Sequence, residues 1–393
     1  MSKSNETTPN VPTLRFAEYI DEWHKYALSD FATRITRRNK NNESSLPLTI
    51  SAQYGLVDQI TFFNKTVASV DLSGYYLLYN GDFAYNKSYS NDYAWGAVKR
   101  LDKYEKGCLS SLYFVFHPTD KVDSDYLTHY FETSKWHKGI SDIAGEGARN
   151  HGLLNMAVDD YFATKHYLPS LSEQKKIACF LNLITKRIEI QNKIISKYET
   201  LIKGIRHRVF GSICGEKQSS LGGFLEEYSE KNVANDLQSV AVGKYGIRKR
   251  EEIYSKELSA DYSKNKVIRK NTLIIGMGST QIDIGILTTD DCYCVSPAYT
   301  TYRIKGINSF YLQEYLIELN PLLSVRYMIT SARQGKAVNK EDLMKHLMTI
   351  HSESEQKEIC QCFENLYSRL QIEKEMLSAL QKQKAFLLQS MFI

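Results

Sequence analysis

The chain has 393 residues, of which 42% are hydrophobic and 24% charged, with a formal net charge of +5. This length predicts two to three domains, and the mildly basic charge permits a polyanionic partner without requiring one. No run of about 18 apolar residues occurs, and the start, MSKSNETTPN, lacks the apolar stretch of a secretory signal. We therefore expect a cytoplasmic protein without a membrane span.

The first half of the chain reads as short strands with turns, followed by helices. Strand-like runs include PLTISAQYG from Pro47 and GYYLLYNGDFAY from Gly74, and DYLTHYFET from Asp125 is typical of a short helix. A long amphipathic helix is predicted after it. Ser170 and Glu173 match a capping box directly before a periodic apolar run, which indicates the start of that helix.

The second half of the chain repeats this order after a polar join, GSICGEKQSS, at 211–220. The strand-like runs VIRKNTLIIG and SPAYTTYRI precede the helical run FYLQEYLIEL, and Ser352 with Glu355 matches a second capping box. We therefore expect a mixed α/β (α+β) globule, a long helix, a second globule and a second long helix.

The two halves are also related residue by residue. The phrase SEQKKI at Ser172 recurs as SEQKEI at Ser354, and residues 172–210 align with 354–392 without a gap. Further back, QYGL faces KYGI and CLSSLYFVF faces CVSPAYTTY, with small changes of offset between them. The sequence therefore predicts two tandem modules related by a pseudo-two-fold axis.

Both long helices carry an apolar seam whose spacing alternates between four and three residues, as in a coiled coil. A polar residue occupies the same seam position in both copies, Gln191 and Glu373. A helix of about 33 residues is roughly 50 Å long and needs a partner, so we predict that the two helices pair as an antiparallel coiled coil. The predicted seam residues are Ile177, Leu181, Ile184, Ile188, Ile195, Tyr198, Ile205, Ile359, Phe363, Leu366, Leu370, Leu377, Leu380 and Leu387.

No catalytic or metal-binding pattern emerges from the sequence. The run LIIGMGST begins like a dinucleotide fingerprint, but Gln281 replaces the third glycine, so a strand and a turn are the simpler interpretation. The EQK runs at 173–175 and 355–357 have nuclease-like spacing without the flanking acidic residue on a strand. The seven cysteines include no C-x-x-C pair and are interpreted as reduced thiols, with a metal site as the remote alternative. We expect no catalytic residue, no metal site and no cofactor bound by this chain.

Basic and polar loop residues are the candidates for contact with DNA. The runs TRITRRNKNN and GKYGIRKRE concentrate them, and Arg can grip guanine with two hydrogen bonds, although a solvated loop is the alternative for each run. These loops differ between the modules while the framework repeats, which suggests that the two modules recognise different DNA sequences. The candidates are Arg34, Arg37, Arg38, Lys40, Tyr54, Lys87, Arg149, Lys244, Tyr245, Arg248, Lys249, Arg250, Gln281, Arg333 and Lys336.

Several runs resemble those of a known family, the specificity (S) subunits of Type I restriction-modification enzymes. LPSLSEQKKIACFLNLITKRIEIQNKIISKYETLIKGIRHRVF at 168–210 looks like its first conserved helical region, and SEQKEICQCFENLYSRL at 354–370 looks like its second. VPTLRFAEYIDEWHKYALSDF at 11–31 is similar to family N-termini, and YNKSYS followed by GCLSSLYFVF resembles one class of target-recognition domain. The resemblance covers nearly the whole chain. The second copy departs from it, because TIHSESEQ lacks the Pro before Glu-Gln and Cys360 replaces the usual Ala.

The resemblance implies two target-recognition domains, each reading one half of a bipartite, gapped site on double-stranded DNA, with the paired helices setting the gap. The expected segments are an N-terminal docking segment (1–27), target-recognition domain 1 (28–169), spacer helix 1 (170–210), a linker (211–220), target-recognition domain 2 (221–351) and spacer helix 2 (352–393).

The same resemblance implies partners that carry the chemistry. Two modification (M) subunits, which bind S-adenosylmethionine and methylate adenine, are expected to dock on the N-terminal segment and the helices. Restriction (R) subunits, which use ATP and Mg²⁺, are expected in the complex. Two alternatives stay open: a stand-alone sequence-specific DNA-binding regulator on the same scaffold, and a coiled-coil scaffold without a nucleic-acid function.

Overall fold

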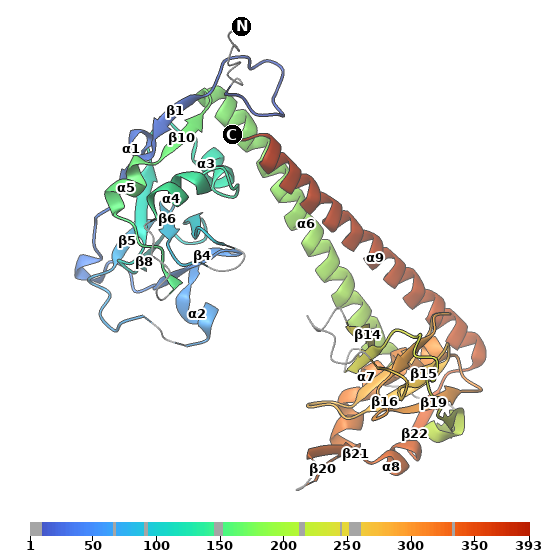
Figure 1. The fold of residues 1–393 in the computed structure, drawn as a ribbon. Helices are drawn as coiled ribbons and strands as arrows, with labels where there is room; N and C mark the ends of the chain where they lie inside the picture. Colours follow the sequence, from blue (N-terminus) through green and yellow to red (C-terminus); the bar gives the residue numbers. More distant parts are fainter. Residues whose placement is uncertain are drawn as a thin grey trace. The chain divides into compact units, whose positions relative to one another are not determined.

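The computed structural model in Figure 1 describes residues 10–65, 68–89, 93–144, 152–211, 217–243, 246–250, 261–331 and 335–393. The chain divides into two compact units. Unit 1 combines Met1–Asn192 with Glu375–Ile393, and unit 2 is Lys193–Lys374. Both long helices therefore contribute one part to each unit.

Unit 1 is built on a four-stranded antiparallel sheet. Of its neighbouring strands, only β6 and β7 are also consecutive in sequence. The order is β2 (Ala32–Arg34), β9 (Phe114–Pro118), β6 (Phe83–Asn86) and β7 (Ala97–Arg100). Three antiparallel pairs accompany it: β1 (His24–Ala27) with β10 (Lys165–Leu168), β3 (Leu48–Ser51) with β4 (Gly55–Asp58), and β5 (Tyr76–Tyr79) with β8 (Lys106–Leu109). The short helices are α1 (Leu28–Phe31), α2 (Gln59–Phe63), α3 (Ser124–Tyr130), α4 (His137–Ile143) and α5 (Val158–Ala163), with a 3-10 turn η1 (Lys40–Asn42).

Unit 2 contains a second four-stranded antiparallel sheet. Its order is β12 (Leu225–Tyr228), β19 (Thr300–Ile304), β16 (Thr272–Gly276) and β17 (Asp283–Leu287). The antiparallel pairs are β11 (Lys217–Ser220) with β22 (Leu347–Ile350), β13 (Val240–Gly243) with β14 (Gly246–Lys249), β15 (Lys266–Ile268) with β18 (Tyr293–Val295), and β20 (Met328–Ser331) with β21 (Gly335–Val338). The helices are η3 (Leu221–Phe224), α7 (Ser309–Tyr327) and α8 (Lys340–Met344).

The predicted tandem repeat is confirmed by the strand pairing. The sheet β2-β9-β6-β7 corresponds strand for strand to β12-β19-β16-β17, and the pairs β3–β4 and β5–β8 correspond to β13–β14 and β15–β18. Equivalent turns hold equivalent glycines, Gly55 with φ +78° and Gly246 with φ +91°, where a side chain would be strained. The equivalent thiols also match: Cys108 donates to Ser44 O and Cys294 to Leu237 O.

Aromatic side chains on the sheet dominate the core of unit 1. Phe83 of β6 stacks on Phe116 of β9 with ring centroids 5.4 Å apart, and Tyr85 stacks on Tyr161 of α5 at 4.7 Å. All of these rings are buried. An aromatic pair contributes roughly 0.5–1.5 kcal/mol beyond the area it buries, so Phe83 and Phe116, which are strand partners, support the register of β6 against β9, and the Tyr85–Tyr161 stack holds α5 on the sheet.

The two long helices, α6 (Leu171–Phe210) and α9 (Glu353–Ser390), lie side by side in each unit (Figure 1). In unit 1, Leu387 and Phe392 share one core with Leu181 near the start of α6. In unit 2, Phe210 at the end of α6 stacks on Phe363 in the first half of α9, with centroids 6.3 Å apart. The start of each helix thus meets the end of the other, which confirms the predicted antiparallel pairing.

The burial pattern along α6 and α9 supports the predicted seam. Every predicted seam residue is buried or half-buried, and none is exposed. The polar seam residues Gln191 and Glu373 are both buried, at 5% exposure each. Ile202, buried at 4%, also faces inward and was not predicted. Ile202 lies four residues after Tyr198 and three before Ile205, so it fills the one position of the α6 alternation of four and three that the predicted seam omitted.

The capping boxes differ between the two helices. At the start of α9 both halves form: Glu355 N–H donates to Ser352 Oγ at 3.3 Å, and Ser352 N–H donates to Glu355 Oε2 at 2.8 Å. At the start of α6, Glu173 N–H donates to Ser170 Oγ at 3.4 Å. The Glu173 carboxylate, however, accepts two hydrogen bonds of 2.7 Å from Arg15. The prediction is confirmed for α9 and only half correct for α6.

Two further observations concern the described residues only. None of their helices is long and apolar enough to cross a membrane. The described cysteines are free thiols, and among the described ranges no group of three or more His, Cys, Asp or Glu residues is placed to hold a metal ion. Cys214 lies outside those ranges.

Candidate nucleic-acid interface

Arg37, in the basic segment after β2, is held by contacts inside unit 1. Its Nη2 forms an ion pair with the buried carboxylate of Asp82, and its Nε donates to Leu77 O at 2.8 Å. The guanidinium also lies 4.5 Å from the ring centroid of Tyr79. Arg37 therefore joins this segment to β5 and to the start of β6, with 39% of its side chain left exposed.

The other predicted residues of this segment differ in how firmly they are held. Arg38 donates to a backbone carbonyl oxygen at 2.8 Å and lies 4.2 Å from the ring centroid of Tyr76. Arg34, at the end of β2, is 4.0 Å from the carboxylate of Asp159, which is exposed. Lys40 is exposed in the η1 turn. The segment thus presents its cations on the surface of the globule.

Tyr54 lies in the turn between β3 and β4, beside two aromatic rings on α2 that we did not predict. Tyr54 and Phe62 are in edge contact at 6.4 Å, and Phe62 and Phe63 at 5.0 Å. Their exposed fractions are 59%, 44% and 44%. Helix α2 lies at the end of unit 1 remote from β1 and β10 (Figure 1). Exposed aromatic rings can serve as platforms on which bases stack. Phe62 and Phe63 were not predicted because adjacent Phe residues in a sequence more often indicate a buried core.

Lys87 follows β6 and lies next to the base of the loop that contains Arg149. Its backbone carbonyl oxygen accepts from Leu154 N–H at 3.0 Å, and its Nζ lies 4.7 Å from the ring centroid of Phe114. Burial lowers the pKa of Lys87. Arg149 itself lies outside the described residues, so of these two candidates the structure places only Lys87.

In unit 2, Arg248, Lys249 and Arg250 lie on β14 and directly after it. Arg248 and Lys249 are exposed, and both line a cavity of about 340 Å³ together with β17, Tyr293 and α7. The predicted residues of the preceding turn, 244–245, lie outside the described residues. Arg248 and Lys249 therefore border a cavity that is large enough to admit small polar groups.

Gln281 lies in the turn between β16 and β17, and this turn is anchored to α7. The neighbouring Ile282 is fully buried; its N–H donates to Ser324 Oγ at 2.9 Å, and its carbonyl oxygen accepts from Asn320 Nδ2 at 3.0 Å. Ser324 Oγ in turn donates to Asn320 Oδ1 at 3.0 Å. Asn320 and Ser324 were not predicted, because polar residues within a helical run usually face solvent.

The last two predicted residues lie at the β20–β21 hairpin. Lys336 is paired with Thr330 in the strand register. Its side chain, like the whole of Arg333, lies outside what the structure describes. DNA contact by Arg333 and Lys336 therefore stays a prediction.

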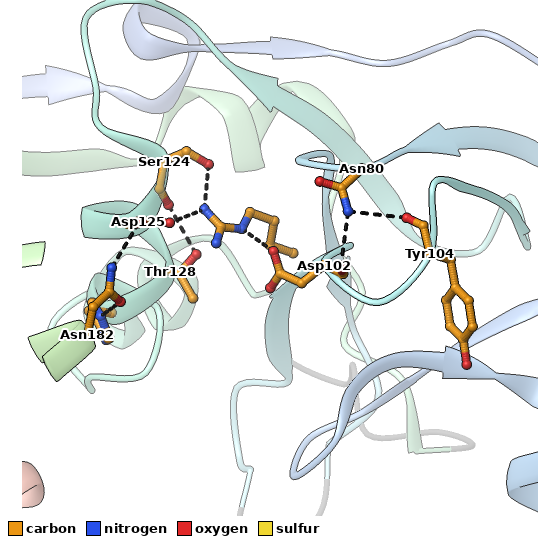
Figure 2. A network of polar contacts seen from close by, with 9 residues as sticks. Asn80, Asp102, Tyr104, Ser124, Asp125, Thr128 and Asn182 are labelled. Atoms are coloured by element: carbon orange, nitrogen blue, oxygen red, sulfur yellow. Dashed lines mark hydrogen bonds and ion pairs between the residues drawn. The ribbon is translucent and has the colours of Figure 1, made fainter. Parts of the chain in front are cut away.

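Figure 2 shows the polar network that fixes the sheet of unit 1 to α6. Arg100 of β7 donates to Ser124 Oγ at 2.9 Å and forms ion pairs with Asp102 at 2.6 Å and Asp125 at 2.7 Å. Asn182 of α6 donates to Asp125 at 2.8 Å. Burial by itself raises the pKa of Asp125, but the hydrogen bond and charge of Arg100 outweigh it and lower the pKa overall. The sheet, α3 and α6 are thereby locked together.

In unit 2 a polar network connects α7 to both long helices. Arg206 of α6 donates to Glu314 of α7 at 2.9 Å and to Tyr367 Oη of α9 at 2.6 Å, and Tyr367 Oη donates to Glu314 at 3.1 Å. Glu314 is 1% exposed. Burial raises the pKa of Tyr367 to about 12. In unit 1 the network therefore joins the sheet to α6 through α3, and in unit 2 it joins α7 to both long helices. Helix α7 in turn anchors the turn between β16 and β17.

The N-terminal segment, predicted to dock a partner, packs on both long helices within unit 1. Leu14 N–H donates to Ser390 O of α9 at 3.0 Å, and Phe16 makes an edge contact with Phe180 of α6 at 5.9 Å. Ile20, in the same segment, is 84% exposed. The segment thus adds an exposed apolar side chain to the surface beside the start of α6.

Comparisons with known proteins identify the fold. No protein-family model matches the chain, and no curated protein matches it. The S subunit of a Type I restriction-modification system from M. genitalium is 16% identical with a TM-score of 0.55, covering 98% of this chain and 99% of that chain. A chain from a structure on complex assembly and conformational transition of the type I R-M system is also 16% identical, with a TM-score of 0.55, over 93% and 96%. The chain shares their fold along nearly its whole length.

Proposed function

We propose that this chain is the DNA sequence-specificity subunit of a Type I restriction-modification system and that it reads a bipartite, gapped site. The observation that carries the proposal is the pair of equivalent sheets, β2-β9-β6-β7 and β12-β19-β16-β17, built with different turns and mounted on an antiparallel helix pair. One scaffold that displays two sets of side chains is suited to read two different half-sites. The shared fold with S subunits supports the same conclusion.

Recognition on this proposal divides between phosphate contacts and base contacts. Exposed cations such as Lys40 and Lys249 neutralise phosphates, which sets affinity and its dependence on salt. Residues in the anchored turns, such as Gln281, contact base edges. A firmly held polar side chain is suited to this task, since it can discriminate between the hydrogen-bond patterns that the bases present in the major groove. The aromatic rings of Tyr54 and Phe62 supply stacking surface in unit 1.

The chemistry belongs to partner subunits on this proposal. Two methyltransferase (M) subunits that bind S-adenosylmethionine dock beside the two helix starts, and restriction (R) subunits with ATP and Mg²⁺ join the same complex. The exposed Ile20 beside the start of α6 supports a docking surface there. This chain contributes recognition and spacing and is not itself the catalyst.

The deciding experiment is methylome sequencing of a host with and without the gene, together with its M partner. A gapped adenine-methylation motif that appears only with the gene supports the proposal. Binding of the complex to a duplex carrying that motif should fall about 10³-fold between 50 and 200 mM salt if about six phosphates are neutralised. A motif that does not depend on the gene, or an affinity that is insensitive to salt, would overturn the proposal. Binding without any M subunit would favour the stand-alone regulator.

A further inference from the structure

Asp283, the first residue of β17, holds its carboxylate among glycines where the turns of two hairpins meet. A β-carbon added to Gly278 would lie 3.0 Å from Asp283 Oδ1, and one added to Gly243 would lie 3.9 Å from the same atom. Gly276 is the strand partner of Asp283, and a β-carbon there would collide with the ring of Tyr299, so this ring packs beside Asp283. Tyr299 covers the Gly276 side of Asp283, and the Gln281 backbone fills the Gly278 side, where it would collide with the added β-carbon. On the Gly243 side, apart from the chain neighbours of Gly243, Asp283 Oδ1 is the only described atom within 4 Å of the added β-carbon, so another molecule can approach the carboxylate from there.

The carboxylate of Asp283 is half-buried and uncompensated. Among the described residues it has no hydrogen-bond donor and no cation as a partner. Burial raises the pKa of the Asp283 carboxyl to about 6, because the charged form loses part of its hydration there. A side chain kept in an unfavourable environment without an internal partner is a candidate for a contact with something outside the chain.

The position of Asp283 is firmly set by its neighbour. Ile282 precedes it directly, and both backbone groups of Ile282 are bonded to α7, the N–H to Ser324 and the carbonyl oxygen to Asn320. Both of these α7 residues are buried. The turn that carries Gln281 and Asp283 is therefore preorganised, and preorganisation is what a specific polar contact requires.

The charge of Asp283 selects the group that it can bind. A carboxylate repels phosphate, so it does not add to affinity for the DNA backbone. In the major groove the donors that match it are the exocyclic amino groups, N4 of cytosine and N6 of adenine. We propose that Asp283 accepts a hydrogen bond from the amino group of one base in the half-site read by unit 2. This inference rests on the proposed function and adds a specificity-determining residue to it.

At the equivalent strand position, unit 1 carries no carboxylate. The strand partners Asn86 and Ala97, at the end of β6 and the start of β7, correspond to Gly276 and Asp283. Ala97 is apolar and buried. The contact therefore belongs to one half-site only, and the other half-site serves as an internal control for folding, assembly and DNA binding.

The test uses the full complex with Asp283→Ala and Asp283→Asn, and Asp290→Ala as the matched control. Asp290, beyond the other end of β17, is an exposed carboxylate paired with Lys270 at 2.9 Å. We expect the methylated motif of Asp283→Ala to become degenerate at one position of one half-site, where the wild type requires C or A on one strand. The other half-site and the gap should be unchanged, and Asp290→Ala should read the wild-type motif.

A base analogue makes the contact explicit. At the degenerate position, the cytosine is replaced by 2-pyrimidinone, or the adenine by purine, so that only the amino group is removed. Wild-type affinity should fall about tenfold, the order expected for one base contact, while Asp283→Ala should bind both duplexes equally. Asp283→Asn keeps one acceptor oxygen and should lie between them.

The outcomes separate the two proposals. If the wild type yields no gapped motif, the proposed function is wrong. If the motif is present and Asp283→Ala reproduces it without degeneracy, or if loss of the amino group weakens the Ala variant as much as the wild type, the assignment of Asp283 is wrong and the function stands. Loss of both half-sites together in Asp283→Ala, but not in Asp290→Ala, would give Asp283 a structural role and also overturn the assignment.

Discussion

At the residue scale, the N-terminal segment meets α6 through two ion pairs that differ in their surroundings. Arg15 forms two hydrogen bonds of 2.7 Å with Glu173, whose side chain is 1% exposed. Lys176 pairs with Glu18, and both side chains are about half exposed, at 45% and 50%. A buried charge that loses its partner is left without compensation, whereas an exposed one is solvated by water. The two pairs are therefore expected to matter unequally.

Arg15→Ala should destabilise the protein by about 3 kcal/mol, because it leaves the Glu173 carboxylate buried and unpaired. Chemical denaturation measures the effect as a lower midpoint. Lys176→Ala is the matched control in the same interface and should change the midpoint little. Equal losses in the two variants would contradict the distinction. The double variant Arg15→Ala with Glu173→Ala should be more stable than Arg15→Ala alone.

His166 of β10 gives a pH dependence with a definite sign. It is buried at 3% exposure, with Nδ1 and Nε2 each 2.8 Å from a hydroxyl, of Tyr130 and Thr164. Burial lowers its pKa from 6.5 to about 4. A depressed pKa means that stability is fully present above pH 6.5 and is lost as pH falls towards 4, by roughly 3 kcal/mol.

Thermal melting between pH 7 and pH 4 measures this dependence. The melting temperature of the wild type should fall over that range, and the fall should be smaller in His166→Gln, which has no proton to gain. His24→Gln removes an exposed histidine of β1 and should follow the wild type. An unchanged slope in His166→Gln would show that other groups control the acid response.

At the element scale, α6 and α9 depend on each other because each carries a long apolar seam. Leu370 of α9 is 7% exposed, while Ile372, two residues on, is 49% exposed. The pair allows the same substitution to be compared inside and outside the seam on one helix. An apolar seam accepts a charge only at a high cost, since a carboxylate there has neither water nor a donor.

Leu370→Asp should therefore lower the free energy of unfolding by at least about 3 kcal/mol, measured in urea, and should impair assembly with M subunits. Ile372→Asp should have a small effect on both. If the two variants behave alike, the seam is not what holds the helices together. A Leu370→Asp complex that assembles normally and reads both half-sites would also contradict the role assigned to the helix pair.

At the scale of the whole molecule, the two units are copies of one plan that have diverged in their turns. The sheets agree strand for strand, but the turn between β6 and β7 spans residues 87–96 and the turn between β16 and β17 only 277–282. The polar networks against α6 also differ: Arg100 joins the sheet of unit 1 to α3, which Asn182 of α6 contacts, whereas Arg206 of α6 joins α7 and α9 in unit 2. The sheets and long helices are thus shared by the two units, whereas the turns that they carry vary independently.

On the proposed function, exchange of residues 221–351 for the equivalent segment of an S subunit with the same fold should change one half-site and leave the other half-site and the gap intact. Reversal of charge at Arg248, Lys249 and Arg250 should weaken the same half-site alone. Methylome sequencing reports both results directly. A change in both half-sites would contradict two independent readers.

The sequence by itself determined the repeat, the two long helices and their antiparallel pairing. These follow from periodicities and repeated phrases that are local, such as SEQKKI and SEQKEI, and helical spacing fixes which face of a helix is apolar. The cap at Ser352 followed for the same reason, because its partner Glu355 is three residues away.

Only the tertiary structure decided which polar side chains have partners within the chain and which are exposed to solvent. Glu173 matches a cap locally, but Arg15, distant by 158 residues, takes its carboxylate. Phe62 is exposed although adjacent Phe residues usually indicate a core, whereas Asp283 is half-buried directly after Ile282, whose backbone is bonded to α7. Burial and partnership are set by segments brought together from far along the chain, and no local pattern contains that information.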